Sequence, residues 1–267
     1  MTKEMSKMDA TEQERLKLAY TRSVEALREV VRELRITEEE LHRAGGFFNR
    51  LGASGFFPSL LDIAFAMTSI DARRREAGTR PNLEGPFYLP GAPFRADGSL
   101  LERPPGPNAE ICTLAGRVTE VETGEPIAGA ELDLWQADEN GEYDHAGFHL
   151  RGVVRTGPDG RYRVTTVLPF DYPQHQDDPI GELLEAMGME VFRAAHIHLK
   201  VRVAGEDRLT TQFFMADSPH LDRDYVVGAV TPDLVIPKAV TVDRDGKRHT
   251  SITFDIALLP QPAPVAT

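Results

Sequence analysis

From about residue 81 onward, polar and apolar residues alternate over short runs, and this pattern constrains the fold more than any other feature of the sequence. The runs are residues 131–136, 161–167, 196–203 and 250–256, and turn pairs such as Asn140-Gly141 and Asp159-Gly160 separate them. A period of two places apolar side chains on one face of a strand, and Asn-Gly or Asp-Gly pairs are typical of tight turns between strands. The pattern, which a single helical patch at residues 181–189 interrupts, predicts an antiparallel β-sandwich over residues 81–267.

Residues 1–80 show instead the spacing of amphipathic helices. Apolar residues recur every three or four positions from Leu16 to Leu34, and Thr11 with Glu14 forms a capping box that predicts the start of this helix. Thr37 and Glu40 repeat the signal before a second helix, four glycines between residues 45 and 57 are expected to interrupt it, and a third helix has its apolar core at residues 60–70. The predicted fold class is therefore mixed and mainly β, with an N-terminal helical region over residues 1–80.

Charge and cysteine content exclude several classes of function. The 267 residues include 30 Lys and Arg against 42 Asp and Glu, a net charge of -12, which argues against a nucleic-acid partner. A single cysteine, Cys112, excludes an intrachain disulfide and a zinc site built mainly on thiolates. The longest apolar run, about residues 60–67, is far shorter than the ~20 residues that cross a bilayer, and the polar N-terminus does not resemble a signal peptide. We expect a cytoplasmic protein that is not transmembrane.

The sequence His196-Ile197-His198 carries the strongest chemical signal. On a strand, residues i and i+2 lie on the same face, so the two imidazoles can converge on one metal ion while Ile197 faces the core. A pair of this kind occurs in several classes of metal site and also in proteins that bind no metal. The pair alone therefore leaves the question of a metal open.

Two tyrosines, Tyr143 and Tyr172, occupy loop positions that are not natural core positions, whereas Tyr162 alternates with apolar residues and is expected in the core. A phenolate is a hard anionic ligand that suits a trivalent cation, and tyrosinate ligation of iron occurs in haem enzymes. Amphipathic residues with solvated hydroxyls at the rim of a domain explain the same positions. From the residues alone both interpretations stay open.

Five motifs follow one another along the chain with regular spacing. They cover residues 83–93 (LEGPFYLPGAP), 124–144, 171–184, 193–201 (RAAHIHLKV) and 208–214 (RLTTQFF). Together they resemble the intradiol ring-cleaving dioxygenases, of the catechol 1,2-dioxygenase and hydroxyquinol 1,2-dioxygenase branch. The resemblance implies a ferric ion, Fe(3+), held by Tyr143, Tyr172, His196 and His198.

The same resemblance assigns further residues. It implies that Arg193 and Gln212 stabilise negative charge developing on the substrate, and that Tyr172 is the ligand that leaves and accepts a proton. A structural ion pair is the alternative role for Arg193. The substrate-binding stretch falls on Leu83, Gly85, Pro86 and Phe87.

The activity implied is that of a non-haem Fe(III) oxidoreductase of aromatic hydrocarbon catabolism. Such an enzyme cleaves catechol or a substituted catechol with O2 between its two hydroxyl-bearing carbons, giving a cis,cis-muconate. A hydroxyquinol 1,2-dioxygenase, which gives maleylacetate, has the same four ligands and stays an alternative. The resemblance also implies a homodimer formed through the N-terminal helices and a phospholipid at the dimer interface.

Departures from the family pattern leave the substrate open. Ala194 follows Arg193 where the family usually has proline, and an additional histidine, His175, follows Tyr172 together with two acidic residues. Two interpretations from other classes also remain. Residues 116–135 resemble a non-catalytic, prealbumin-like β-sandwich binding module, and the histidine pair is compatible with a zinc hydrolase, although no catalytic acid is evident beside it.

Overall fold

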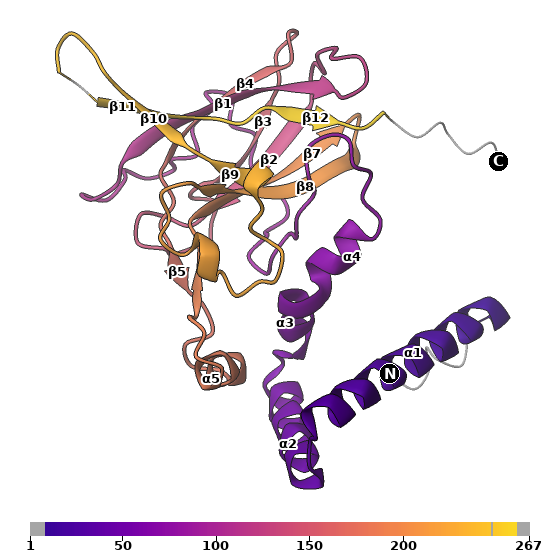
Figure 1. Ribbon diagram of the computed structural model, residues 1–267. Helices are drawn as coiled ribbons and strands as arrows, with labels where there is room; N and C mark the ends of the chain where they lie inside the picture. The colour runs from indigo at the N-terminus through magenta and orange to yellow at the C-terminus, as the bar shows by residue number, and fades with distance from the viewer. Residues whose placement is uncertain (1–8, 247, 261–267) are drawn as a thin grey trace. The chain divides into compact units, whose positions relative to one another are not determined.

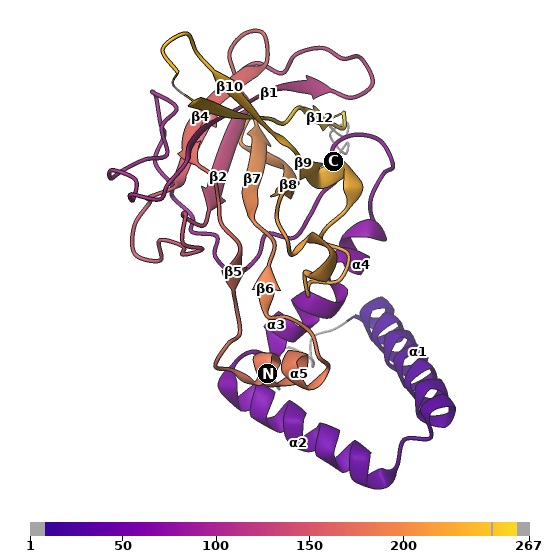
Figure 2. The ribbon, with the colours of Figure 1, turned by 60° about the vertical axis from the view of Figure 1, so that its left-hand side comes forward.

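Residues 9–246 and 248–260 are described by the computed structural model shown in Figures 1 and 2. The chain divides into two units, Met1–Ala53 and Ser54–Thr267. Residues 54–80, which we assigned to the N-terminal region, group with the sheets in the second unit. Among the described residues no single helix is long and apolar enough to cross a membrane, and only the bent pair Glu38–Ser54 and Phe57–Asp71 reaches that length and composition when the two are counted together.

The first unit contains two helices, α1 (Ala10–Leu34) and α2 (Glu38–Ser54). The predicted start of α1 at Thr11 was wrong, because Asp9 is the N-cap: its carboxylate accepts a hydrogen bond from the Glu12 amide, and the Glu12 side chain accepts one from the Asp9 amide, both at 2.9 Å. The second capping box is confirmed, since the Thr37 amide donates to Glu40 at 2.7 Å and the Glu40 amide donates to the Thr37 hydroxyl at 3.2 Å.

The glycine-rich segment does not interrupt α2 where we expected it to. Gly45, Gly46 and Gly52 all lie inside the helix, which ends just before Gly55, where φ is +82°. A glycine inside a helix costs only about 1 kcal/mol of stability relative to alanine. The stabilisation from the acidic first turn and from the long helical run exceeds the summed cost of the three glycines. Only the left-handed conformation at Gly55 ends the helix.

The third predicted helix is present but is not uniform. It consists of α3 (Phe57–Leu61), a π-helical turn η2 (Asp62–Ala66) and α4 (Met67–Asp71). π-helical turns are rare in proteins, and those that occur often lie at functional sites. Three further short helices lie in the loops between strands: α5 (Pro179–Ala186), η3 (Leu221–Arg223) and η4 (Pro232–Leu234).

Two five-stranded sheets and one two-stranded sheet form most of the second unit. The first sheet contains β10 (Lys238–Val242), β11 (Arg248–Thr253), β1 (Ile111–Glu120), β12 (Ile256–Leu258) and β4 (Arg161–Val167). The second has the order β3 (Arg151–Arg155), β2 (Glu131–Gln136), β7 (His196–Val203), β8 (Glu206–Met215), β9 (Val235–Ile236). The short pair is β5 (Tyr172–Pro173) with β6 (Phe192–Arg193), and Figure 2 shows it extending from the second sheet toward α5.

The prediction of a mainly β fold is confirmed, but the prediction of purely antiparallel sheets was wrong. Strand β1 pairs in parallel with β11 and β12, and β8 pairs in parallel with β9. Turn pairs in the sequence define the relative direction only of strands that follow one another, whereas these parallel partners are joined by long connections. The sheets are therefore mixed.

Buried side chains join elements of the two larger sheets. Gln136 on β2 donates a hydrogen bond to the Val167 carbonyl on β4 at 2.9 Å and accepts one from the Thr166 hydroxyl at 2.8 Å. Phe213 on β8 stacks on Phe254, with ring centroids 4.5 Å apart. Tyr162 is buried as expected, and its hydroxyl donates to the Phe254 carbonyl at 2.6 Å.

Candidate metal centre

His196 and His198 lie on the same face of β7, and both rings are buried. Their Nε2 atoms are 2.9 Å apart. The Nδ1–H of His196 donates to the Ala194 carbonyl at 2.6 Å, which leaves Nε2 of that ring with its lone pair. Ile197 between them is fully buried. Period-two alternation therefore places both imidazoles where one ion can meet both nitrogens.

The ring of His198 is held between neighbours on both sides. It stacks on Trp135 of β2, its partner in the sheet register, with centroids 4.8 Å apart and planes 6° apart. Gly85 lies against the same ring: a Cβ there would be 3.3 Å from His198 Cε1, and φ is +75°, so both space and backbone conformation favour glycine. No described residue forms a hydrogen bond with Nδ1 of His198.

Tyr143 comes to this pair from the loop that follows β2, and Tyr172 comes from the short strand β5. Both side chains are buried, so the interpretation as solvated rim residues was wrong. Their rings meet edge to face at 5.4 Å, and the Tyr143 hydroxyl is 3.4 Å from His196 Nε2. The Tyr172 ring lies 5.6 Å from the ring of His196. Four side chains separated by up to 55 positions in the sequence therefore form one cluster.

Burial determines the protonation of this cluster. It raises the pKa of Tyr143 well above its usual value, with Tyr172 adding to the effect, and it raises the pKa of Tyr172 although Arg193 acts in the opposite direction. Burial, with the nearby Arg193 charge, lowers the pKa of His196 to about 3, and burial lowers the pKa of His198 well below its usual value. Both imidazoles are therefore neutral at neutral pH and free to donate a lone pair, and the two phenols ionise there only beside a strong cation.

These donors fit a single metal ion. Two ligands at right angles with bonds of about 2.1 Å are separated by about 3.0 Å, close to the separation of the two Nε2 atoms. Within the part of the chain that the structure describes, no group of three or more His, Cys, Asp and Glu residues could hold a metal. The two buried phenols are oxygen donors beside this pair, a set that suits a hard trivalent ion better than the usual donor set of a zinc hydrolase.

Arg193 forms a buried ion pair with Asp224, which is the structural role that the sequence left as an alternative to catalysis. Its Nε is 2.9 Å from both carboxylate oxygens of Asp224, which also accepts hydrogen bonds from the amides of Ala194 and Val226 at 3.0 Å. Arg193 is also the register partner of Tyr172 in the β5–β6 pair. Its Nη2 is buried and makes no hydrogen bond to a described residue. Arg193 is thus a fixed cation with one donor still free.

Gln212 lies opposite His198 in the sheet register and is fully buried. Its amide nitrogen donates to Asn82 Oδ1 at 2.7 Å, and Asn82 donates in turn to the Ala229 carbonyl at 2.8 Å. The atom of Gln212 without a described partner is the acceptor Oε1. Its Nε2 carries a second N–H besides the one donated to Asn82, so the role of Gln212 in stabilising negative charge stays a prediction.

The predicted substrate-binding stretch reaches the same centre. Leu83 and Pro86 line a pocket of about 30 Å³ that Arg193 also lines. The Phe87 ring is 4.6 Å from Tyr143 and 6.1 Å from Tyr172. A cavity that holds a benzene ring measures about 150 Å³, so an aromatic ligand must displace side chains to enter.

Four further residues of this site were not predicted from the sequence: Asn82, Trp135, Arg151 and Asp224. His175, noted in the sequence only as a departure from the family pattern, lines the same pocket as Arg193. The guanidinium of Arg151 lies 5.7 Å from the centroid of the Tyr143 ring and donates to the Phe87 carbonyl at 2.7 Å. Trp135, the single tryptophan, had a detectable signal because it lies in an alternating run beside the second motif. Asp224 had none, since it lies in a loop 31 residues from the arginine that it pairs with.

Comparison with known proteins gives matches to ring-cleaving dioxygenases by sequence and by structure. The family model described as "Dioxygenase" matches residues 83–260. The chain is 32% identical to 6-chlorohydroxyquinol 1,2-dioxygenase of Cupriavidus pinatubonensis, over 85% of this chain and 86% of that protein. It is 34% identical to chlorocatechol 1,2-dioxygenase of a Pseudomonas species, over 91% of this chain and 96% of that protein. The crystal structure of hydroxyquinol 1,2-dioxygenase from Pseudomonas putida superposes with a TM-score of 0.82 at 28% identity, covering 92% of each chain. The chain belongs to the family of intradiol ring-cleaving dioxygenases.

Proposed function

We propose that this enzyme holds Fe(III) through Tyr143, Tyr172, His196 and His198 and cleaves catechol or a substituted catechol with O2 to a cis,cis-muconate. The family uses non-haem iron. The observation that carries the proposal is the 2.9 Å separation of two neutral imidazole nitrogens beside two buried phenols. When bound, the ferric ion supplies Lewis acidity that lowers the pKa of the diol and allows the electron-rich ring to react with O2.

The side chains of the site have separate roles in this proposal. Tyr172 lies on a strand of only two residues, so its side chain, which would hold the ion as a phenolate, could move away and take up the proton of an incoming hydroxyl to become a phenol. Arg193, held by Asp224, offers its free Nη2 to the negative charge that develops on the substrate. Leu83 and Pro86 border the ring.

We infer that the two larger sheets face each other as a β-sandwich, because Gln136 bonds to β4 and Phe213 stacks on Phe254. The catalytic domain then comprises residues 81–267 together with residues 54–80, which group with the sheets, and the other N-terminal helices precede it in the chain. Neither the prealbumin-like module nor the zinc hydrolase accounts for the tyrosines. A hydroxyquinol substrate stays the alternative within this function, because the named relatives act on both hydroxyquinols and chlorocatechols.

The purified protein is expected to be red-brown and to contain one iron per chain, with a broad visible band from tyrosinate-to-Fe(III) charge transfer. Addition of catechol under anaerobic conditions should shift this band, and air should then bleach the new absorption as O2 is consumed. Absorption spectroscopy, iron analysis and an oxygen electrode test this. A colourless protein that stays inactive after iron loading would contradict the proposal.

The helical region is proposed as the homodimer interface. Helix α1 buries none of its residues, and its apolar stripe includes Leu16, Leu27 and Leu34, each at least 45% exposed. We expect a dimer by light scattering, and we expect Leu27→Glu with Leu34→Glu to yield monomers. Leu18→Glu is the control, because Leu18 is equally exposed but lies off the stripe. A dimer that survives the double substitution refutes this interface; lipid extraction and mass spectrometry of the dimer test the phospholipid.

A further inference from the structure

A buried histidine that the proposed mechanism does not use follows Tyr172 by three residues. His175 is 8% exposed, and it lines the same small pocket as Arg193 and Leu83. Its Nδ1–H donates to Asp178 Oδ2 at 2.6 Å, while the other carboxylate oxygen of Asp178 caps helix α5. Edge-on contacts with Phe56 and Tyr225, at 5.7 and 5.9 Å, fix the ring further.

The backbone at His175 has an unusual conformation. Its φ is +66°, in the left-handed region that a residue with a side chain seldom adopts. Successive side chains of an extended chain point to opposite sides, yet Gln174 and His175 both line the pocket. Conformational strain of this kind persists where the surroundings enforce it, and it concentrates at functional sites. The strained turn brings two adjacent polar side chains to one cavity.

These two side chains offer complementary hydrogen-bonding atoms. Because Nδ1 of His175 donates to Asp178, the nitrogen left for a ligand is the acceptor Nε2. The carbonyl oxygen of Gln174 accepts a hydrogen bond from the Tyr225 hydroxyl at 2.8 Å, so the atom left on that side chain is its amide donor. A hydroxyl group both donates and accepts, and it satisfies both atoms at once. A chlorine or hydrogen substituent donates nothing to Nε2 and leaves it desolvated and unpaired.

The charges around the pocket disfavour a carboxylate substituent. The positive charge of Arg193 is already paired with Asp224, and the His175 ring is already paired with Asp178. Asp62 of the π-helical turn adds a negative charge to the pocket wall. A neutral hydrogen-bonding substituent is therefore favoured over an anionic one.

We propose that His175 and Gln174 bind a third hydroxyl group on the substrate ring, so that the enzyme prefers a trihydroxybenzene of the hydroxyquinol type to catechol or chlorocatechol. The inference rests on the proposed function and names its substrate class. His175 acts here as a specificity-determining residue, distinct from the groups that hold the metal.

The test compares kcat/KM for hydroxyquinol, catechol and 4-chlorocatechol by O2 uptake. The native enzyme should favour hydroxyquinol over catechol by at least about tenfold, because a site built to bind a hydroxyl discriminates against analogues that lack it. His175→Phe should lower this ratio by about tenfold or more, mainly through a lower kcat/KM for hydroxyquinol, while the visible band from the metal ligands is kept. His175→Asn provides a second variant, since asparagine tolerates the left-handed conformation and is too short to supply the same acceptor.

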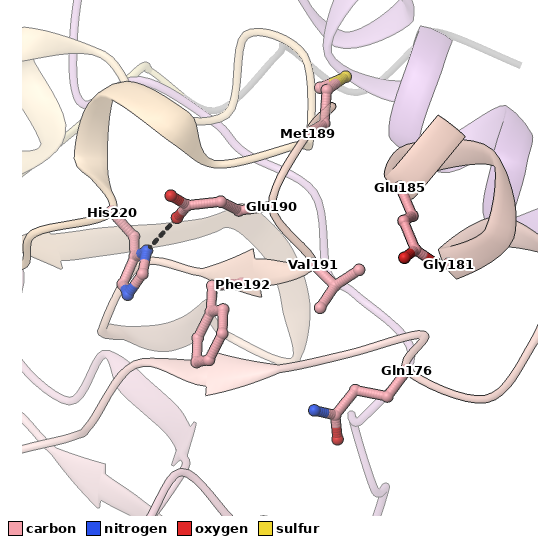
Figure 3. A pocket seen from close by; sticks show the side chains of 8 residues that line it. All are labelled: Gln176, Gly181, Glu185, Met189, Glu190, Val191, Phe192 and His220. Atoms are coloured by element: carbon pink, nitrogen blue, oxygen red, sulfur yellow. Dashed lines mark hydrogen bonds and ion pairs between the residues drawn. The ribbon is translucent and has the colours of Figure 1, made fainter. Parts of the chain in front are cut away.

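The matched control is His220→Phe. His220 also donates a hydrogen bond from Nδ1 to a carboxylate, that of Glu190 at 2.8 Å, but it lines a separate pocket beside α5 together with Phe192 and Met189 (Figure 3). Its replacement should leave the substrate ratio unchanged. The inference is overturned, while the proposed function stands, if the native enzyme prefers catechol or 4-chlorocatechol. It is also overturned if both His175 variants keep the native ratio of kcat/KM for hydroxyquinol to that for catechol. If the iron-loaded protein oxidises none of these three substrates, the proposed function itself is overturned, and the inference with it.

Discussion

Replacement of Tyr143 by phenylalanine is expected to weaken or remove the visible band of the iron-loaded enzyme and to lower O2 uptake with catechol by at least about 100-fold. Loss of residues that only support metal ligands already costs about 10–100-fold in affinity or activity, and loss of a ligand should cost more. Tyr143 is buried against Phe87 and Tyr172, so phenylalanine fills the same space and removes only the oxygen. Absorption spectra, iron content and oxygen-electrode rates measure the effect.

The chain provides a matched control for this substitution. Tyr162 is as deeply buried as Tyr143, but its hydroxyl donates to the Phe254 carbonyl, away from the metal cluster. Tyr162→Phe should keep the colour and the activity and should lower the free energy of unfolding by about 1 kcal/mol for the lost hydrogen bond. Unchanged colour and rate in Tyr143→Phe would exclude Tyr143 as a ligand.

The parts of the fold that the sequence predicts well are those set by local pattern. Strands β2, β4 and β7 begin and end where the alternating runs do. Period-two burial explains this directly for β4, whereas β2 and the first half of β7 bury residues on both faces. The same rule places His196 and His198 on one face. The helical patch predicted at residues 181–189 is present as α5 (Pro179–Ala186), shifted by two to three residues, because apolar spacing is a local signal whereas the cap at Asp178 and Pro179 set the observed start.

The parts that the sequence does not predict depend on contacts between distant segments. The parallel pairing of β1 with β11 and β12 depends on the whole topology, because no turn signal joins these strands. The conformation of His175 depends on Asp178 and on the packing of α5, which no propensity describes. The free amide oxygen of Gln212 likewise depends on Asn82, which lies 130 residues away.

The resemblance to a family supplied the ligand set, and the structure adds the environment of those ligands. The tyrosines could be assigned to a metal from motifs, but only the structure excludes the solvated alternative by burying both rings. For Arg193, catalytic and structural interpretations were alternatives at the level of sequence. The ion pair with Asp224 and the free Nη2 show that one side chain can serve both roles.

Removal of Asp224 is expected to destabilise the enzyme more than any other substitution considered for this site. The Asp224 side chain is 1% exposed and accepts from Arg193 and from two backbone amides. Asp224→Ala leaves a buried guanidinium without its partner, and breaking a buried pair in this way costs about 3–5 kcal/mol. Urea unfolding of the iron-loaded protein measures this loss. The control is Glu131→Ala, which breaks the exposed pair with Arg155 and should cost at most about 1 kcal/mol.

A double substitution then separates the two roles of Arg193. Replacing a buried ion pair by apolar residues of similar volume is often neutral for stability, so Arg193→Met with Asp224→Leu should recover most of the loss seen in Asp224→Ala. Activity should not recover, because methionine has no donor to replace Nη2 beside the substrate. We expect a stable, coloured protein whose kcat is lowered by at least about 100-fold, with a smaller change in KM. If the double variant is stable and turns over catechol at the native rate, Arg193 serves only the fold, and the negative charge on the substrate is stabilised by another group.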